Sequence, residues 1–106
     1  MAAIFLAGAI AFEVVGTLFL RASDGFTRLW PSVGTAAGYV LAFVLLAQAL
    51  KAIDVGVAYA VWAGLGTALI TVIGILALGA PATALKLAGT ALIVVGVVAL
   101  NLSSAH

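Results

Sequence analysis

The sequence predicts an all-α integral membrane protein with four transmembrane helices, and three observations carry this prediction. Of its 106 residues, 67% are hydrophobic and 7% are charged, whereas a soluble domain carries about 25% charged residues. The mean hydropathy is +1.43. The chain also divides into four apolar stretches of the ~20 residues that a helix needs to cross a bilayer. These features exclude classical soluble enzymes and nucleic-acid binders, since a net charge of +1 offers phosphates no basic surface.

The first predicted helix covers residues 2–21 and the second covers residues 31–50. Arg21 suits the end of the first helix, because a cation is favourable at a helix C-terminus. A Ser-Asp-Gly turn at residues 23–25 follows. Pro31 suits the first turn of the second helix, where a missing N–H costs nothing.

The third predicted helix covers residues 55–78 and the fourth covers residues 83–102. Asp54 can cap the start of the third helix with its carboxylate. Gly79 can end it, because glycine tolerates the left-handed conformation that closes many helices. The loops are short, so residues 1–106 are expected to form a single four-helix transmembrane domain.

The basic residues predict how the chain lies in the membrane. An even number of spans puts both termini on one side, with Lys51, and puts Arg21, Arg28 and Lys86 on the other. The positive-inside rule favours a cytoplasmic location for the side with three basic residues. The difference of three against one is small, so the chain can insert in both orientations. Four helices are too few to enclose a pathway for an organic molecule. Because transporters often use inverted repeats, we expect an antiparallel, dual-topology homodimer.

Glu13 is the main candidate functional residue. It lies about 16 Å along the first helix, near the middle of a ~30 Å hydrocarbon layer, where an acidic group is costly and usually functional. Every lysine and arginine lies at a helix end or in a loop, so Glu13 has no cationic partner at its depth. Such a carboxyl group can hold a proton or a cation in turn. The alternative is a protonated acid that bonds to Thr17 and serves packing alone.

The side chains that share a helical face with Glu13 are small or smooth, with one hydroxyl. This face suits either a cavity wall or the close approach of another helix. Its members are Leu6, Ala9, Ile10, Gly16 and Thr17. In a cavity wall, Leu6, Ile10, Gly16 and Thr17 are expected to contact the substrate, with Gly16 leaving space for it.

Aromatic residues form a second candidate site. Tyr59 and Trp62 share a face of the third helix, and aromatic faces attract organic cations. Tyr39 and Phe43 form a weaker version of the same pattern on the second helix. The alternative for both pairs is ordinary core packing.

Two glycine pairs have different expected roles. Gly64 and Gly66 would either bend the third helix or allow close packing there. Gly89 and Gly96 lie on one face of the fourth helix, where small residues favour helix–helix contact. We therefore expect the fourth helix to form the dimer contact.

The sequence favours no metal site or cofactor. It has no cysteine, and its single histidine, His106, is the last residue. The first helix is expected to be retained rather than cleaved, because no basic segment precedes it and it contains Glu13.

Three segments, taken together, are similar to one known family. Residues 12–17 read FEVVGT, residues 25–34 read GFTRLWPSVG, and residues 58–66 read AYAVWAGLG. The chain resembles the small multidrug resistance family of bacterial proton-coupled exporters over nearly its whole length.

The resemblance implies a multi-pass inner (plasma) membrane protein, powered by the proton motive force, that works as an antiparallel homodimer. It implies that both Glu13 carboxyls bind protons and a lipophilic cation in turn. It also assigns substrate contacts to Tyr59, Trp62, Tyr39 and Phe43, a kink to Gly64 and Gly66, and dimerisation to Gly89 and Gly96.

Within the family, the sequence favours the multidrug and quaternary-ammonium exporters. Gly16-Thr17 and Asn101 match that branch, whereas guanidinium exporters tend to carry tryptophan at the position of Gly16. The chain departs from the family at two places. Ala63 stands where a hydroxyl residue is common in the family, and residues 80–86 lack the Arg and Asp that the family usually carries there. A guanidinium exporter and a heteromeric pair remain alternatives.

Two alternatives come from other classes of protein. A rotor-ring proteolipid is also small and apolar, with one membrane carboxylate, but it carries that group on a late helix among glycine repeats. A purely structural membrane subunit is the second alternative, and it predicts that Glu13→Gln changes nothing. We favour an antiporter that exchanges protons on paired Glu13 residues for a lipophilic cation by alternating access.

Overall fold

The computed structural model describes residues 1–104, so the terminal His106 lies outside the described part. It contains four α-helices, α1 (Ala2–Ala22), α2 (Leu29–Ala49), α3 (Val55–Ala77) and α4 (Ala84–Ser104). All four are long and apolar enough to cross a membrane, which confirms the predicted fold class. Each helix end lies within two residues of its predicted position.

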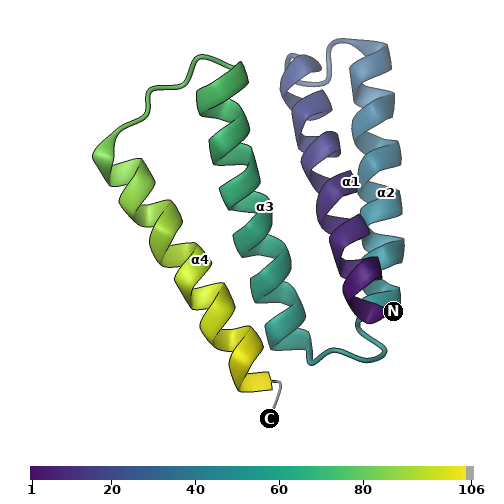
Figure 1. Cartoon of the computed structure of the whole chain (residues 1–106). Helices are drawn as coiled ribbons and strands as arrows, with labels where there is room; N and C mark the ends of the chain where they lie inside the picture. Colours follow the sequence, from purple (N-terminus) through teal and green to yellow (C-terminus); the bar gives the residue numbers. More distant parts are fainter. Residues whose placement is uncertain (105–106) are drawn as a thin grey trace. The chain divides into compact units, whose positions relative to one another are not determined.

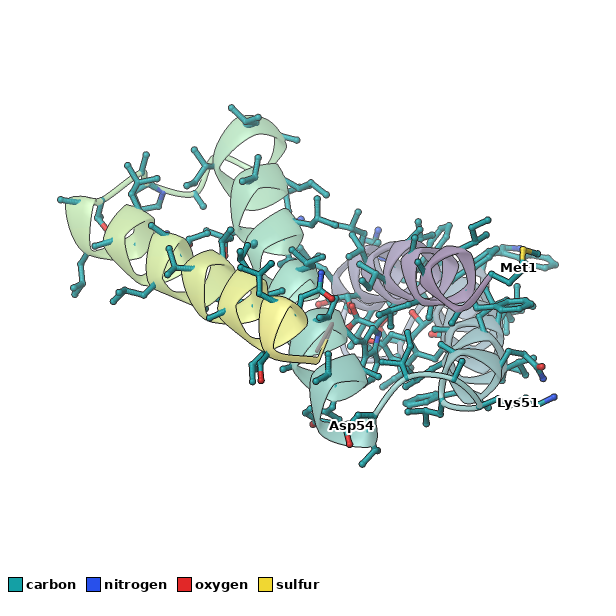
Figure 2. The ribbon with its side chains drawn as sticks, turned by 60° about the horizontal axis from the view of Figure 1, so that its bottom comes forward. Met1, Lys51 and Asp54 are labelled. Atoms are coloured by element: carbon teal, nitrogen blue, oxygen red, sulfur yellow. The ribbon has the colours of Figure 1, made fainter. Side chains whose placement is uncertain are left out.

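The helices form two hairpins, which are described separately. The first comprises residues 1–53 and the second begins at Asp54. Figure 1 shows α1 beside α2 in one hairpin and α3 beside α4 in the other. Met1 and Lys51 lie at the same end of the first hairpin (Figure 2), as an antiparallel pair requires. The assembly of the two hairpins as a single domain stays a prediction.

A tight turn joins α1 to α2. The buried Ser23 hydroxyl donates to the carbonyl oxygen of Leu20 at 2.7 Å and accepts from the amide of Phe26 at 3.1 Å. Asp24, Gly25 and Phe26 all have positive φ, at 51°, 69° and 66°. The chain therefore reverses within a few residues, and α2 is placed directly against α1.

The second helix begins two residues earlier than predicted, at Leu29 instead of Pro31. Arg28 precedes it in an extended conformation, with φ −106° and ψ 124°. Pro31 still falls within the first turn, where its missing N–H removes no helical hydrogen bond. Leu29 and Trp30 therefore form the first two residues of the helix, although the residue before a proline disfavours the helical conformation.

The capping residues predicted for α3 are confirmed. The Asp54 carboxylate accepts a hydrogen bond from the amide of Val57 at 3.2 Å. At the other end Gly79 adopts φ +73°, and the amide of Ala80 donates to the carbonyl of Gly74 at 2.9 Å. The left-handed glycine thus turns the chain back on the last turn of the helix and ends it.

One glycine sets the contact between α3 and α4. A Cβ on Gly64 would lie 2.5 Å from Cγ2 of Val97 and 3.2 Å from Cγ2 of Ile93. Only a residue without a side chain fits at this crossing. Most other α4 side chains, Leu85 and Leu92 among them, are exposed and apolar. Such a surface suits lipid or a further helix rather than water.

Candidate functional site

Glu13 lies at the middle of α1, about 16 Å from the start of that helix. Its side chain is half-buried. The hydroxyl of Thr17 donates a hydrogen bond to Oε1 of Glu13 at 3.1 Å. The two residues are four apart, so they lie one above the other on the same helical face.

Tyr39 extends this contact to α2. Its hydroxyl lies 2.8 Å from Oγ1 of Thr17, and either oxygen can donate. Tyr39 lies at the middle of α2, as Glu13 does in α1. Glu13, Thr17 and Tyr39 therefore form a continuous hydrogen-bonded chain between the two helices, near the middle of each.

The first hairpin provides no cation beside Glu13. Arg21 lies two helical turns away, roughly 12 Å further along the axis. Arg28 lies at the turn and Lys51 at the opposite end of the hairpin, and both are exposed. Within residues 1–53, the side-chain group that contacts the carboxyl of Glu13 is a hydroxyl and not a cation.

Three predicted substrate-contacting residues of α1 are buried within the structure. Leu6 and Ile10 are almost inaccessible, at 6% and 5% exposure, and Gly16 is buried as well. A Cβ on Gly16 would lie 2.8 Å from Cδ1 and 2.9 Å from Cε1 of Tyr39. The space that glycine leaves at this position is thus filled by the ring of Tyr39. A role for these residues in substrate contact stays a prediction.

The predicted aromatic pair of α3 is formed. The rings of Tyr59 and Trp62 meet edge to face, with centroids 5.8 Å apart and planes at 83°. Trp62 is half-buried and Tyr59 is 62% exposed. On α2, Phe43 is also exposed, whereas Tyr39 is turned into the contact with α1. Tyr39 and Phe43 therefore have different surroundings, although their spacing in the sequence predicted that they would act as a pair.

The two predicted glycine pairs also differ. Helix α3 continues without interruption through Gly64 and Gly66, and Gly64 has the packing role described above. A Cβ on Gly89 or Gly96 would meet nothing within 4 Å. Gly96 is exposed and open to a partner or to lipid, whereas Gly89 is half-buried beside α3. The kink and the dimer contact stay predictions.

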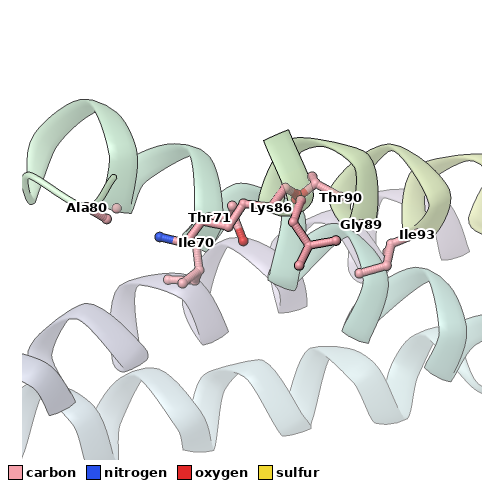
Figure 3. Close-up of a pocket in the computed structure, with 9 residues that line it drawn as sticks. Ile70, Thr71, Ala80, Lys86, Gly89, Thr90 and Ile93 are labelled. Carbon is pink, nitrogen blue, oxygen red and sulfur yellow. The ribbon is translucent and has the colours of Figure 1, made fainter. Parts of the chain in front are cut away.

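A hollow of about 350 Å³ lies between the C-terminal half of α3 and the N-terminal half of α4 (Figure 3). Lys86 lies beside it, and its Nζ donates to the carbonyl oxygen of Pro81 at 2.9 Å. Of the predicted functional residues, only Gly89 is in its wall. Its lining residues are Ile70, Thr71, Gly74, Ala80, Leu85, Lys86, Gly89, Thr90 and Ile93.

Sequence reasoning missed the contact between Thr17 and Tyr39. The antiparallel arrangement of two 21-residue helices already brings the middle of one opposite the middle of the other. The sequence does not show how each helix is rotated about its own axis. The glycines at positions 16 and 38 were the available signal, since small residues mark the faces where membrane helices meet.

Comparison with known proteins identifies the family. The family model described as Small Multidrug Resistance protein matches residues 1–93. Multidrug resistance protein Mmr of Mycobacterium tuberculosis is 49% identical over 104 residues, which is 97% of either chain. Multidrug resistance protein EbrB of Bacillus subtilis is 44% identical over 103 residues, 97% of this chain and 88% of EbrB.

Multidrug transporter EmrE of Escherichia coli is 46% identical over 101 residues, 95% of this chain and 92% of EmrE. Four membrane-spanning helices and bacterial relatives of this similarity indicate a multi-pass protein of the inner membrane. The family model and these relatives each cover most of the chain, and the chain therefore belongs to the Small Multidrug Resistance family.

Proposed function

We propose that the chain is a proton-coupled antiporter that exports lipophilic, quaternary-ammonium-like cations. Family membership and the names of its relatives support the broader statement that it is a multidrug-resistance efflux transporter and not an enzyme. The proton coupling, the class of cation and the part played by Glu13 are our proposal. The proton motive force is the proposed energy source, and no cofactor is required.

The observation that carries the proposal is the carboxyl of Glu13 in the middle of a membrane-spanning helix. Within its hairpin, Glu13 bonds to a hydroxyl and to no cation. A carboxylate in a medium of low dielectric constant is strongly stabilised by a positive charge, and a proton or an organic cation can supply it. Because the two compete for one group, binding of one releases the other. That competition is the basis of exchange.

The aromatic pair of α3 supports a lipophilic cation as the substrate. The edge-to-face contact leaves a large part of the Tyr59 ring exposed. A cation over such a face gains about 0.5–2 kcal/mol, with the larger value where water is excluded. A quaternary ammonium ion cannot donate a strong hydrogen bond, so it depends on this attraction and on the carboxylate. A guanidinium ion has planar N–H donors and depends on hydrogen-bond acceptors instead.

An antiparallel homodimer would provide two copies of Glu13 and two copies of the aromatic pair. A four-helix chain fills its own interior, and two inverted copies reproduce the symmetry that many transporters obtain from internal repeats. We propose that the paired Glu13 residues take up protons on one side of the membrane. The two subunits would then exchange conformations, and the protons would be released as a cation binds from the other side. A second exchange of conformations would carry the cation across the membrane.

Proton release on substrate binding tests this proposal. Tetraphenylphosphonium is added to the purified, weakly buffered protein near pH 7, and guanidinium is added in a parallel sample. We expect protons to be released by tetraphenylphosphonium from the wild type, less from Glu13→Asp, and none from Glu13→Gln. Release by guanidinium alone would move the chain to the guanidinium branch. No release by either cation would contradict carboxylate exchange at Glu13.

A further inference from the structure

The chain of hydroxyls beside Glu13 has a defined direction. A hydroxyl group carries one hydrogen and can accept two hydrogen bonds. The Thr17 hydrogen is used in the bond to Oε1 of Glu13. The hydrogen in the 2.8 Å contact between Thr17 and Tyr39 must then belong to Tyr39. With Glu13 ionised, Tyr39 donates to Thr17 and Thr17 donates to Glu13.

We propose that Thr17 is a positioning residue that transmits the protonation state of Glu13 to Tyr39 by reversing these hydrogen bonds. This inference rests on the proposed role of Glu13 as the group that takes up a proton. When Glu13 is protonated, its own O–H can donate to Thr17. The Thr17 hydrogen then turns toward Tyr39, whose hydroxyl oxygen becomes the acceptor and whose own hydrogen turns away from Thr17. No covalent bond to oxygen is exchanged, since each hydroxyl only rotates.

The surroundings of the chain favour this arrangement. Tyr39 is the other titratable group that α2 brings to Glu13, and the charged Arg21, Asp24, Arg28 and Lys51 lie toward the ends of the hairpin. Within residues 1–53, no nearby charge therefore fixes the direction of the hydroxyls. In a medium without water, an unused hydroxyl hydrogen is costly, so the three groups are expected to change direction together.

Gly16 keeps the Tyr39 hydroxyl within reach of Thr17. Even a methyl group at position 16 would lie 2.8–2.9 Å from two carbons of the Tyr39 ring, which is too close for any side chain. The backbones of α1 and α2 are also in contact nearby, at Gly38. A substituent on Gly16 would displace the ring and lengthen the contact with Thr17, although all three polar groups would still be present. Gly16 therefore acts through Tyr39.

Infrared difference spectroscopy of the full-length protein in lipid nanodiscs tests the inference. Spectra are recorded as tetraphenylphosphonium is added, and released protons are counted in the same preparation. The band of the Glu13 acid is assigned by its loss in Glu13→Gln. The band of the Tyr39 hydroxyl is assigned by its loss in Tyr39→Phe.

In the wild type we expect the Tyr39 band to shift whenever the Glu13 acid band disappears. Thr17→Val removes the hydroxyl without changing the shape of the side chain, and we expect the Tyr39 shift to be lost. Thr17→Ser retains the hydroxyl and should retain the shift. Gly16→Ala should also lose it. Thr35→Val is the matched control, because the Thr35 hydroxyl donates to the carbonyl of Pro31 at 3.1 Å and is not in the chain.

The outcomes separate this inference from the proposed function. If the wild type releases protons and the Tyr39 band does not respond, or responds equally in Thr17→Val, the reversal is wrong and exchange at Glu13 stands. If the wild type releases no proton, the proposed function fails and the inference fails with it. Loss of the Tyr39 response in Thr35→Val would also overturn the inference, because the effect would not depend on the Thr17 hydroxyl.

Discussion

Gly16 and Gly38 bring the backbones of α1 and α2 into direct contact. A Cβ on Gly38 would lie 3.0 Å from Cα and 3.2 Å from the amide nitrogen of Gly16, and 3.1 Å from the carbonyl oxygen of Phe12. These neighbours are all backbone atoms, so they cannot move aside as a flexible side chain can. The same close approach places the ring of Tyr39 over Gly16 and its hydroxyl against Thr17.

Replacing Gly38 by alanine should weaken the first hairpin. We expect Gly38→Ala to lower the free energy of unfolding by about 1–3 kcal/mol, because the added methyl group forces the two backbones apart. Unfolding by a denaturing detergent, followed by circular dichroism, measures this change.

Gly8→Ala is the matched control for that measurement. A Cβ on Gly8 would meet Cδ1 of Leu45 at 3.0 Å, which is the far end of a flexible side chain. Leu45 can adopt another rotamer at a lower cost than a backbone shift. A loss of stability in Gly8→Ala as large as that in Gly38→Ala would contradict the backbone contact.

The sequence was sufficient to predict the helices of this protein and their ends. Asp54 and Gly79 carry local signals, a capping carboxylate and a left-handed glycine, and both act as predicted. The mid-helix position of Glu13 followed from counting residues. Pro31 was less informative, since proline fits any position of the first turn and so marks a helix start only to within a few residues.

The contacts of the site could not be predicted in the same way. The hydrogen bond between Thr17 and Glu13 joins residues four apart in one helix, and the sequence predicted it as one alternative. The hydrogen bond between Thr17 and Tyr39 depends instead on how α1 and α2 are rotated about their axes. Hydropathy gives little information on that rotation, because these helices are apolar on almost every face. Gly16 shows the consequence, since the space it leaves was expected for a substrate and is filled by Tyr39.

Gly89 and Gly96 of α4, where an added Cβ would meet no atom within 4 Å, form the predicted dimer contact. We expect Gly89→Leu and Gly96→Leu to reduce the dimeric fraction in lipid bilayers, because a bulky side chain would hold two helices apart. Single-molecule photobleaching of labelled protein measures that fraction. Ala91→Leu is the control, since Ala91 is exposed and lies 200° around the helix from Gly89 at about 100° per residue. A dimeric fraction unchanged in both glycine variants would place the contact elsewhere.

The balance of basic residues predicts the effect of Lys51 on orientation. In the predicted topology, Lys51 is the one lysine or arginine on the side opposite Arg21, Arg28 and Lys86. Removing it in Lys51→Ala should shift the population toward one orientation, with the three remaining cations in the cytoplasm. A reporter fused to the C-terminus measures the two orientations, and Lys51→Arg should match the wild type. If the wild type already shows one orientation, the antiparallel dimer is excluded.

Coupled transport tests the central claim, the exchange of protons for a cation at Glu13, most directly. The protein is reconstituted in liposomes with an acidic interior, and the uptake of methyl viologen, a quaternary pyridinium, is followed with time. We expect accumulation by the wild type that stops when an ionophore removes the pH gradient, and no accumulation by Glu13→Gln. Uptake by Glu13→Gln equal to that of the wild type, or uptake indifferent to the pH gradient, would contradict the account.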